Sequence, residues 1–172
     1  ASKETGPVVF EGNAPADIRD NHELAVALGI EPSGGPEETC AWLGAPNSIK
    51  GPTGAVFGAQ SSSNLLIIGQ NEEMAFSMII SSLISLAAQQ SSGRAEFIVL
   101  DAFPDHSAKR EMMDQVIAML PHRVRSLKDE RLEDIMERLE THMDQRTEHG
   151  AVHGEIYFIV IGLQLFKKLR PE

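Results

Sequence analysis

A glycine turn at Gly69 is the part of the sequence with the layout of a phosphate site. The apolar run Leu65–Ile68 leads into Gly69, Gln70 and Asn71, and a long uncharged segment follows from Met74. Four apolar residues between polar ones are typical of a strand buried in a parallel sheet. A strand that ends in glycine and turns into a helix has the order of a phosphate-binding loop, because N–H groups at the helix N-terminus face the anion. Gly69, Gln70 and Asn71 are therefore the candidate cofactor-binding residues.

The side chains that a working phosphate loop needs are missing from this turn. Such a loop reads GxxxxGK[ST], with a lysine for the phosphates and a hydroxyl for magnesium. The second glycine, the lysine and the hydroxyl positions hold Met74, Ala75 and Phe76. Glu72 and Glu73 suit the positive end of the helix but repel a polyphosphate. We expect a vestigial loop that holds no cofactor; an ordinary strand–helix turn with acidic capping is the alternative.

Other reactive side chains form no catalytic or metal site that the sequence supports. His149 and His153 stand four residues apart, a spacing that chelates a metal on a helix. Gly150 and a predicted loop from Glu148 to Gly154 argue against a helix there, so we expect no metal site. The serines lie in no GxSxG nucleophile elbow. We assign no catalytic residue.

The composition indicates an acidic protein of ordinary domain size. The chain has 172 residues, a formal net charge of −10 and one cysteine, Cys40. The net charge opposes binding to nucleic acid, so the basic clusters Arg123–Arg125 and Lys167–Arg170 are expected to be solvated edges. The uncharged run Met74–Gly93 is rich in serine and follows a predicted strand, which favours a buried helix over a membrane span. With no visible targeting segment and no possible intrachain disulfide, we expect a cytoplasmic protein without membrane insertion.

Strands and helices are expected to alternate along the chain. The predicted strands are residues 8–10, 54–57, 65–68, 97–101 and 156–161. The predicted helices are residues 17–28, 74–90, 107–120 and 132–143, the third capped by Asp105 or Ser107 and ended by Pro121. This alternation predicts an α/β fold with a parallel sheet and helices on both faces. Residues 1–40 are expected to be an N-terminal extension and linker, and residues 41–172 the main domain.

Four segments carry a family resemblance. They are Leu65–Gly69, Phe97–Asp101, the helical stretch Leu-Glu-Thr-His-Met-Asp-Gln-Arg at residues 139–146, and Ile156–Ile161. Their order over residues 41–172 resembles the RecA-like motor domain of the FtsK/SpoIIIE/HerA group of ring-forming DNA translocases and their type VII secretion relatives. In that family the first segment enters the phosphate loop, the second ends in Asp, the third ends in Glu-Met-x-x-Arg, and the last precedes the acids that organise magnesium.

The resemblance implies a degenerate member of that group. Gly162 and Leu163 stand where the family carries Asp-Glu, so the Walker A and Walker B motifs both lack their functional groups. It further implies a P-loop NTPase-type sheet that is C-terminally incomplete, within a family that uses ATP and magnesium. The implied partners are other ATPase domains of the same chain or a homo-oligomeric, hexameric ring, with DNA or a secreted protein handled by the parent machine.

Two further functions stay open at the level of sequence. One is an active ATP-driven DNA translocase domain with an atypical nucleotide site, in which Gln70 and Asn71 replace the usual groups. The other is a substrate-recognition module of a type VII secretion-like ATPase, in which an empty pocket accepts a peptide. Whether the chain has enzymatic activity is therefore left open by the sequence.

Overall fold

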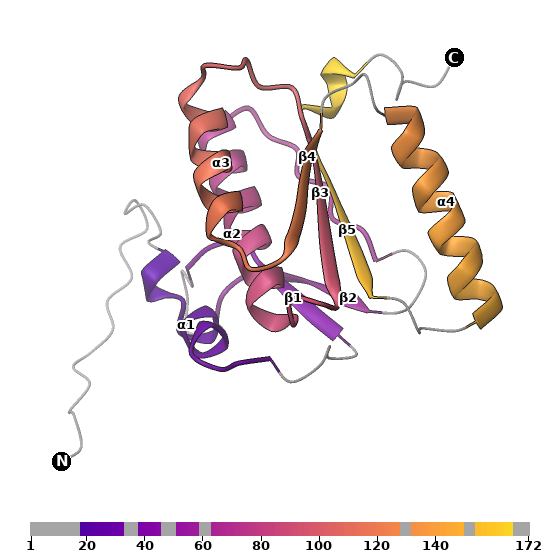
Figure 1. Ribbon diagram of the computed structural model, residues 1–172. Coiled ribbons are helices and arrows are strands. Elements are labelled where there is room, and N and C mark those ends of the chain that lie inside the picture. The colour runs from indigo at the N-terminus through magenta and orange to yellow at the C-terminus, as the bar shows by residue number, and fades with distance from the viewer. Residues whose placement is uncertain are drawn as a thin grey trace. The chain divides into compact units, whose positions relative to one another are not determined.

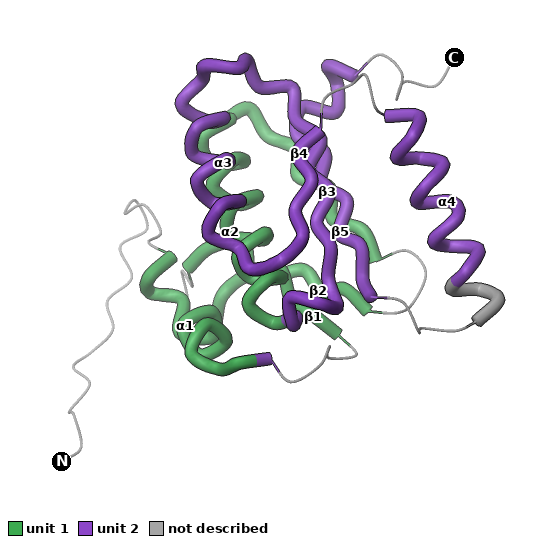
Figure 2. The backbone as a smooth tube through the Cα atoms, viewed as in Figure 1, with its two compact units in different colours: residues 1–31, 37–89 green, residues 32–36, 90–172 purple. Residues whose placement is uncertain are grey.

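The computed structural model describes residues 18–32, 38–45, 51–58, 63–127, 132–149 and 154–166. The chain divides into two compact units, residues 1–31 with 37–89 and residues 32–36 with 90–172 (Figure 2). The predicted strand at residues 8–10 and the basic cluster Lys167–Arg170 lie outside the described residues. The domain boundary expected after residue 40 stays a prediction.

The first unit contains a short helical segment, a two-stranded sheet and a long helix. Its elements are η1 (Ile18–Asp20), α1 (His22–Leu28), β1 (Glu38–Trp42), β2 (Gly54–Gly58) and α2 (Glu72–Gln89). The Asn21 side chain accepts a hydrogen bond from the Leu24 N–H at 3.0 Å and so caps α1. The helix ends at Leu28, which is also the last residue of the helix predicted there, and Gly29 follows as its C-cap.

The polar side chains of α2 hydrogen-bond the backbone of β1. β1 pairs with β2 in antiparallel register, with Cys40 opposite Val56. The Gln89 side chain accepts from the Cys40 N–H at 3.0 Å and donates to the Cys40 carbonyl at 2.7 Å, while Ser81 donates to the Trp42 carbonyl at 2.7 Å. Ser81 and Gln89 therefore hold α2 close to the antiparallel pair of β1 and β2. These contacts also satisfy backbone groups on the second edge of β1.

The second unit is a parallel sheet with one helix on each face (Figure 1). Its elements are β3 (Ala95–Asp101), α3 (Ala108–Met119), β4 (Arg123–Leu127), α4 (Leu132–His149), β5 (Glu155–Ile161) and η3 (Leu163–Leu165). The strand order is β4-β3-β5, and both pairs are parallel, with Phe97 opposite Val124 and Tyr157. The prediction that residues 97–100 and 156–161 belong to one parallel sheet is confirmed. Ser107 caps α3, as one of the two predicted candidates.

The prediction of a strand at Leu65–Ile68 is wrong. Residues 63–69 form no regular secondary structure, and Ile68 and Leu66 are 86% and 70% exposed. An apolar run indicates a tendency to be buried, but a strand also requires a partner for its ladder of hydrogen bonds. β4 and β5 occupy the two edges of β3. β4 was not predicted from the sequence, because Arg123 and Arg125 were interpreted as a solvated edge.

Alternate residues of β3 point to opposite faces of the sheet, as the pleat requires. Leu100 packs with Leu132 of α4 and with Phe166. Its neighbour Asp101 pairs with Arg110 of α3. The two helices therefore cover opposite faces, and Phe97, Ile98, Val99 and Leu100 are fully buried between them. Among the described helices, α2 included, none is at once long enough and apolar enough to cross a bilayer.

Glu96 joins β3 to β4 and α4 by ion pairs. Arg138 of α4 donates to both carboxylate oxygens of Glu96, at 3.0 and 2.6 Å, and Arg125 Nε lies 2.8 Å from Oε1. Burial opposes the charge of Glu96, but the hydrogen bonds and charge of Arg138 and the charges of Arg125 and Arg123 outweigh it. The pKa of Glu96 therefore lies below its ordinary value of 4.5.

Replacing Glu96 by Gln is expected to lower the free energy of unfolding by about 1–2 kcal/mol at neutral pH, because partly exposed charge-assisted bonds are lost. Since the pKa is lower in the folded protein, this stabilisation is complete above about pH 4.5 and is lost as the pH falls through the folded-state value. Urea unfolding from neutral pH down to about pH 3 would measure the difference between the two proteins.

The matched control is Asp134→Asn, which removes an exposed carboxylate from α4, the helix that carries Arg138; this variant should follow the wild-type profile closely. A stability difference between Glu96→Gln and wild type that stays constant down to acid pH would contradict the role assigned to Glu96.

Candidate functional site

The topology of the second unit directs attention to the carboxyl edge of its sheet. From β3 the chain crosses to β4 on one side, and it then crosses back over β3 to β5 on the other. The carboxyl ends of β3 and β5 therefore flank the point at which the winding direction reverses. In open parallel sheets, ligands bind in the crevice that such a reversal creates.

A hollow is present at this edge. It has a volume of about 330 Å³ and is lined by residues from the two loops that follow β3 and β5: Asp101, Ala102, Phe103, Pro104, Asp105, Leu165 and Phe166. The lining contains the end of β3 at Asp101, the exposed carboxylate of Asp105 and apolar side chains, but neither Lys nor Arg. It therefore offers a polyphosphate no cationic side chain among the described residues.

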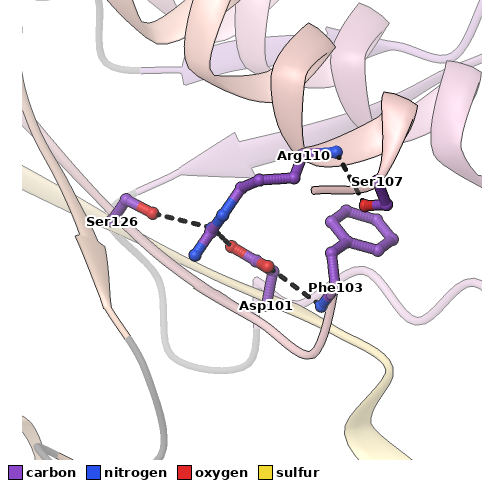
Figure 3. Close-up of polar contacts among 5 residues, drawn as sticks. All are labelled: Asp101, Phe103, Ser107, Arg110 and Ser126. Atoms are coloured by element: carbon purple, nitrogen blue, oxygen red, sulfur yellow. Dashed lines mark hydrogen bonds and ion pairs between the residues drawn. The ribbon is translucent and has the colours of Figure 1, made fainter. Parts of the chain in front are cut away.

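The carboxylate of Asp101, at the end of β3, is buried and already paired (Figure 3). The side chain of Asp101 has no exposed surface and forms an ion pair with Arg110 of α3. Its other oxygen accepts from the Phe103 N–H at 3.1 Å. Arg110 also donates to Ser126 Oγ of β4 at 3.2 Å. Since both oxygens of Asp101 have partners within the protein, the carboxylate is a structural group rather than an open metal ligand.

The position after β5 is shaped for glycine. Gly162 has a φ of +78°, the left-handed region that side chains rarely adopt. A Cβ built there would lie 3.3 Å from Ala102 Cβ and 3.4 Å from Leu165 Cδ1. Leu163, the next residue, is exposed and begins η3. The backbone at residue 162 therefore disfavours an acidic side chain at the place where the family resemblance expects one.

The predicted phosphate loop lies in the first unit, at the start of α2. Gly69, Gln70 and Asn71 are exposed, and Gly69 is not in the left-handed conformation. The Asn71 side chain accepts from the Met74 N–H at 3.0 Å, so it caps the helix that an anion would otherwise approach. Phe76, at the hydroxyl position of the pattern, is buried. Their vestigial nucleotide role stays a prediction.

The remaining candidate groups give no second site in the described part of the chain. No set of three His, Cys, Asp or Glu side chains there could hold a metal ion. Glu148 and His149 belong to the end of α4, so the loop predicted to begin at Glu148 is wrong for these two residues, and His153 lies outside the described residues. The helix continues because no proline or glycine interrupts it before Gly150. In the first unit, burial and the charge of Glu23 raise the pKa of Cys40, which keeps its thiol protonated.

Comparisons with protein-family models, with curated proteins and with solved structures find no match to this chain. The site must therefore be interpreted from its own geometry. Sequence reasoning noted that residues 97–101 end in an acid but missed its partner Arg110. An arginine at the third position of a helix that directly follows such a strand was the available signal.

Removing the cation of the buried pair should destabilise the protein strongly. Arg110→Leu leaves the Asp101 carboxylate buried without a counter-ion, and we expect a loss of about 3–5 kcal/mol in the free energy of unfolding. Chemical denaturation of the folded chain measures it. Asp101→Asn combined with Arg110→Leu should recover part of the loss, while Ser126→Ala should cost only about 1 kcal/mol. A loss below that of Ser126→Ala would show that the pair is not a structural constraint.

Introducing the family acid at Gly162 should also destabilise the fold. Gly162→Asp places a side chain in the left-handed region beside Ala102 and is expected to cost about 1–3 kcal/mol. Gly69→Asp is the matched control, since a Cβ there meets nothing within 4 Å. Thermal melts of both variants measure the contrast, and equal melting temperatures would contradict it.

Proposed function

We propose that this chain is a catalytically degenerate RecA-like module of an FtsK/SpoIIIE/HerA-type multidomain ATPase. Its role is structural: it packs against active ATPase domains, stabilises their ring or regulates their nucleotide cycle. The observation that carries the proposal is the carboxyl edge of the parallel sheet, where Asp101 is neutralised by Arg110 and Gly162 contributes no carboxylate. A nucleotide site needs a carboxylate at such an edge to hold magnesium and its water shell.

The start of α2 supports the same proposal independently. A phosphate loop presents free N–H groups and a lysine to the anion. Here the Asn71 side chain occupies the Met74 N–H, and Ala75 stands at the lysine position. Glu72 and Glu73 place two carboxylates in the first turn of the helix. A nucleotide would therefore have to displace the helix cap and overcome like-charge repulsion.

The partners under this proposal are ATPase domains, in the same chain or in a hexameric homo-oligomer. Those domains would bind ATP and magnesium and would move DNA or a secreted protein, in the cytoplasm. This module would contribute surface rather than chemistry. A net charge of −10 fits contacts with proteins better than direct contact with nucleic-acid phosphates.

The hollow at the carboxyl edge favours one second candidate function, a substrate-recognition module of a type VII secretion-like ATPase. Phe103, Leu165 and Phe166 give the hollow an apolar wall, and Asp105 adds an exposed carboxylate. This lining suits an apolar peptide side chain beside a basic one better than a nucleotide. Among the described residues, no observation favours the hypothesis of an active translocase in the same way.

The chain should bind Mg-ATP more weakly than a Kd of about 100 μM, equivalent to roughly −5.5 kcal/mol. Each charge-assisted contact to phosphate contributes about 1.5–3 kcal/mol, and several of these contacts are missing. Isothermal titration calorimetry at neutral pH, with ATP and magnesium, measures the affinity, and a phosphate-release assay should detect no hydrolysis above background.

Titration with magnesium alone is the control. Binding of Mg-ATP with a Kd below about 100 μM would refute the degenerate-module proposal and support the active-translocase hypothesis. A variant meant to restore the phosphate loop should carry Ala75→Lys, which returns the missing lysine. Phe76 should be kept, because it is buried and its replacement would lower the free energy of unfolding by about 3–5 kcal/mol.

A further inference from the structure

Three arginines converge on one glutamate near the amino-terminal end of the parallel sheet. Arg123 and Arg125 lie two residues apart on β4. Arg138 lies on α4, the helix that covers the face of the sheet on which Glu96 lies. Their Nε or Nη atoms lie 2.6–3.8 Å from the carboxylate oxygens of Glu96. We call Glu96, Arg123, Arg125 and Arg138 the arginine cluster.

The cluster holds more positive charge than its glutamate neutralises. Within the described residues, Glu96 is the one carboxylate that these guanidinium groups contact. Three cations and one anion leave a local excess of two positive charges in a chain whose net charge is −10.

The hydrogen-bond donors of the cluster are also incompletely used. Arg138 donates to Glu96 with both terminal nitrogens, whereas Arg125 forms an ion pair with it through Nε alone, at 2.8 Å. Arg123 lies 3.8 Å from the carboxylate, beyond hydrogen-bond distance, and its side chain is 64% exposed. The terminal nitrogens of Arg125 and the whole guanidinium of Arg123 are thus available, and Glu96 holds Arg125 in place.

We propose that the arginine cluster is a binding site for a single phosphate group of a small phosphorylated molecule. Paired guanidinium groups bind phosphate oxygens through parallel N–H donors, which a lysine cannot do. Glu96 is 13% exposed and stays beneath the site, where it orients the arginines without covering Arg123. The site is distinct from the hollow, because Glu96 and Asp101 lie near opposite ends of β3.

The charges around the cluster select a compact ligand over nucleic acid. On α4 the exposed carboxylates Asp134 and Glu137 stand four residues and one residue before Arg138, and Glu133 lies in the same turn as Asp134. A single phosphate contacts the arginines alone. An extended polyanion would also run along these carboxylates, which oppose it at low and moderate salt.

The experiment is a titration of the full 172-residue chain with inorganic phosphate at constant ionic strength, followed by NMR of the arginine side chains and backbone amides. We expect saturable shifts confined to residues near Arg123, Arg125 and Arg138, with millimolar affinity. Arg123→Gln should weaken binding about fivefold, and Arg125→Gln should do the same. Arg94→Gln, which removes an exposed arginine outside the cluster, is the matched control and should leave the affinity unchanged.

Two kinds of result would overturn the proposal, namely failure of phosphate binding at the cluster and preference for a different ligand. One is the absence of saturable shifts at the cluster, or equal affinity in Arg123→Gln and the control. The other is binding of a single-stranded oligonucleotide at the same residues more than about tenfold tighter than phosphate at equal salt, which would make the ligand nucleic acid. Circular dichroism of each variant verifies the fold. The cluster shares no residue with Gly69–Asn71, and its expected millimolar affinity is weaker than the limit of about 100 μM set for Mg-ATP, so the two measurements remain distinguishable.

Discussion

The buried charge of Asp101 constrains the rest of the parallel sheet. A carboxylate without exposed surface is tolerated in a protein only when a cation and hydrogen-bond donors surround it. Arg110 supplies the cation from α3, Ser126 holds Arg110 from β4, and the Phe103 N–H binds the other oxygen from the following loop. One interaction thus fixes how far α3 lies along the sheet and where β4 stands beside β3.

The same constraint shapes what the carboxyl edge can do. This edge is where an α/β sheet of this winding places its ligands, and here the chain uses its polar groups for its own structure. The left-handed Gly162 keeps the neighbouring strand end free of a carboxylate. What remains is a shallow, partly apolar hollow beside an exposed Asp105. Such a surface suits contact with protein better than metal-dependent phosphate chemistry, which supports the structural role proposed above.

Local patterns predicted the elements whose signals are local. The cap at Ser107, the end of a helix at Gly29 and the apolar runs of β3 and β5 could all be recognised from neighbouring residues, because caps and burial depend on nearby side chains. β4 could not be recognised, since its alternating arginines pair with Glu96, which is distant in sequence. Leu65–Ile68 was mistaken for a strand because an apolar run says nothing about an available partner.

The sequence by itself determined which chemistry is absent: no lysine follows Gly69 at the required spacing, and no acid follows β5. It also determined the α/β alternation, because helix and strand periodicities are properties of short segments. Only the tertiary structure decided that Asp101 is neutralised and that three arginines meet at Glu96. Pairing of charges depends on which strands lie side by side and on which helix covers each face. Both of these depend on contacts between residues that are far apart in the chain.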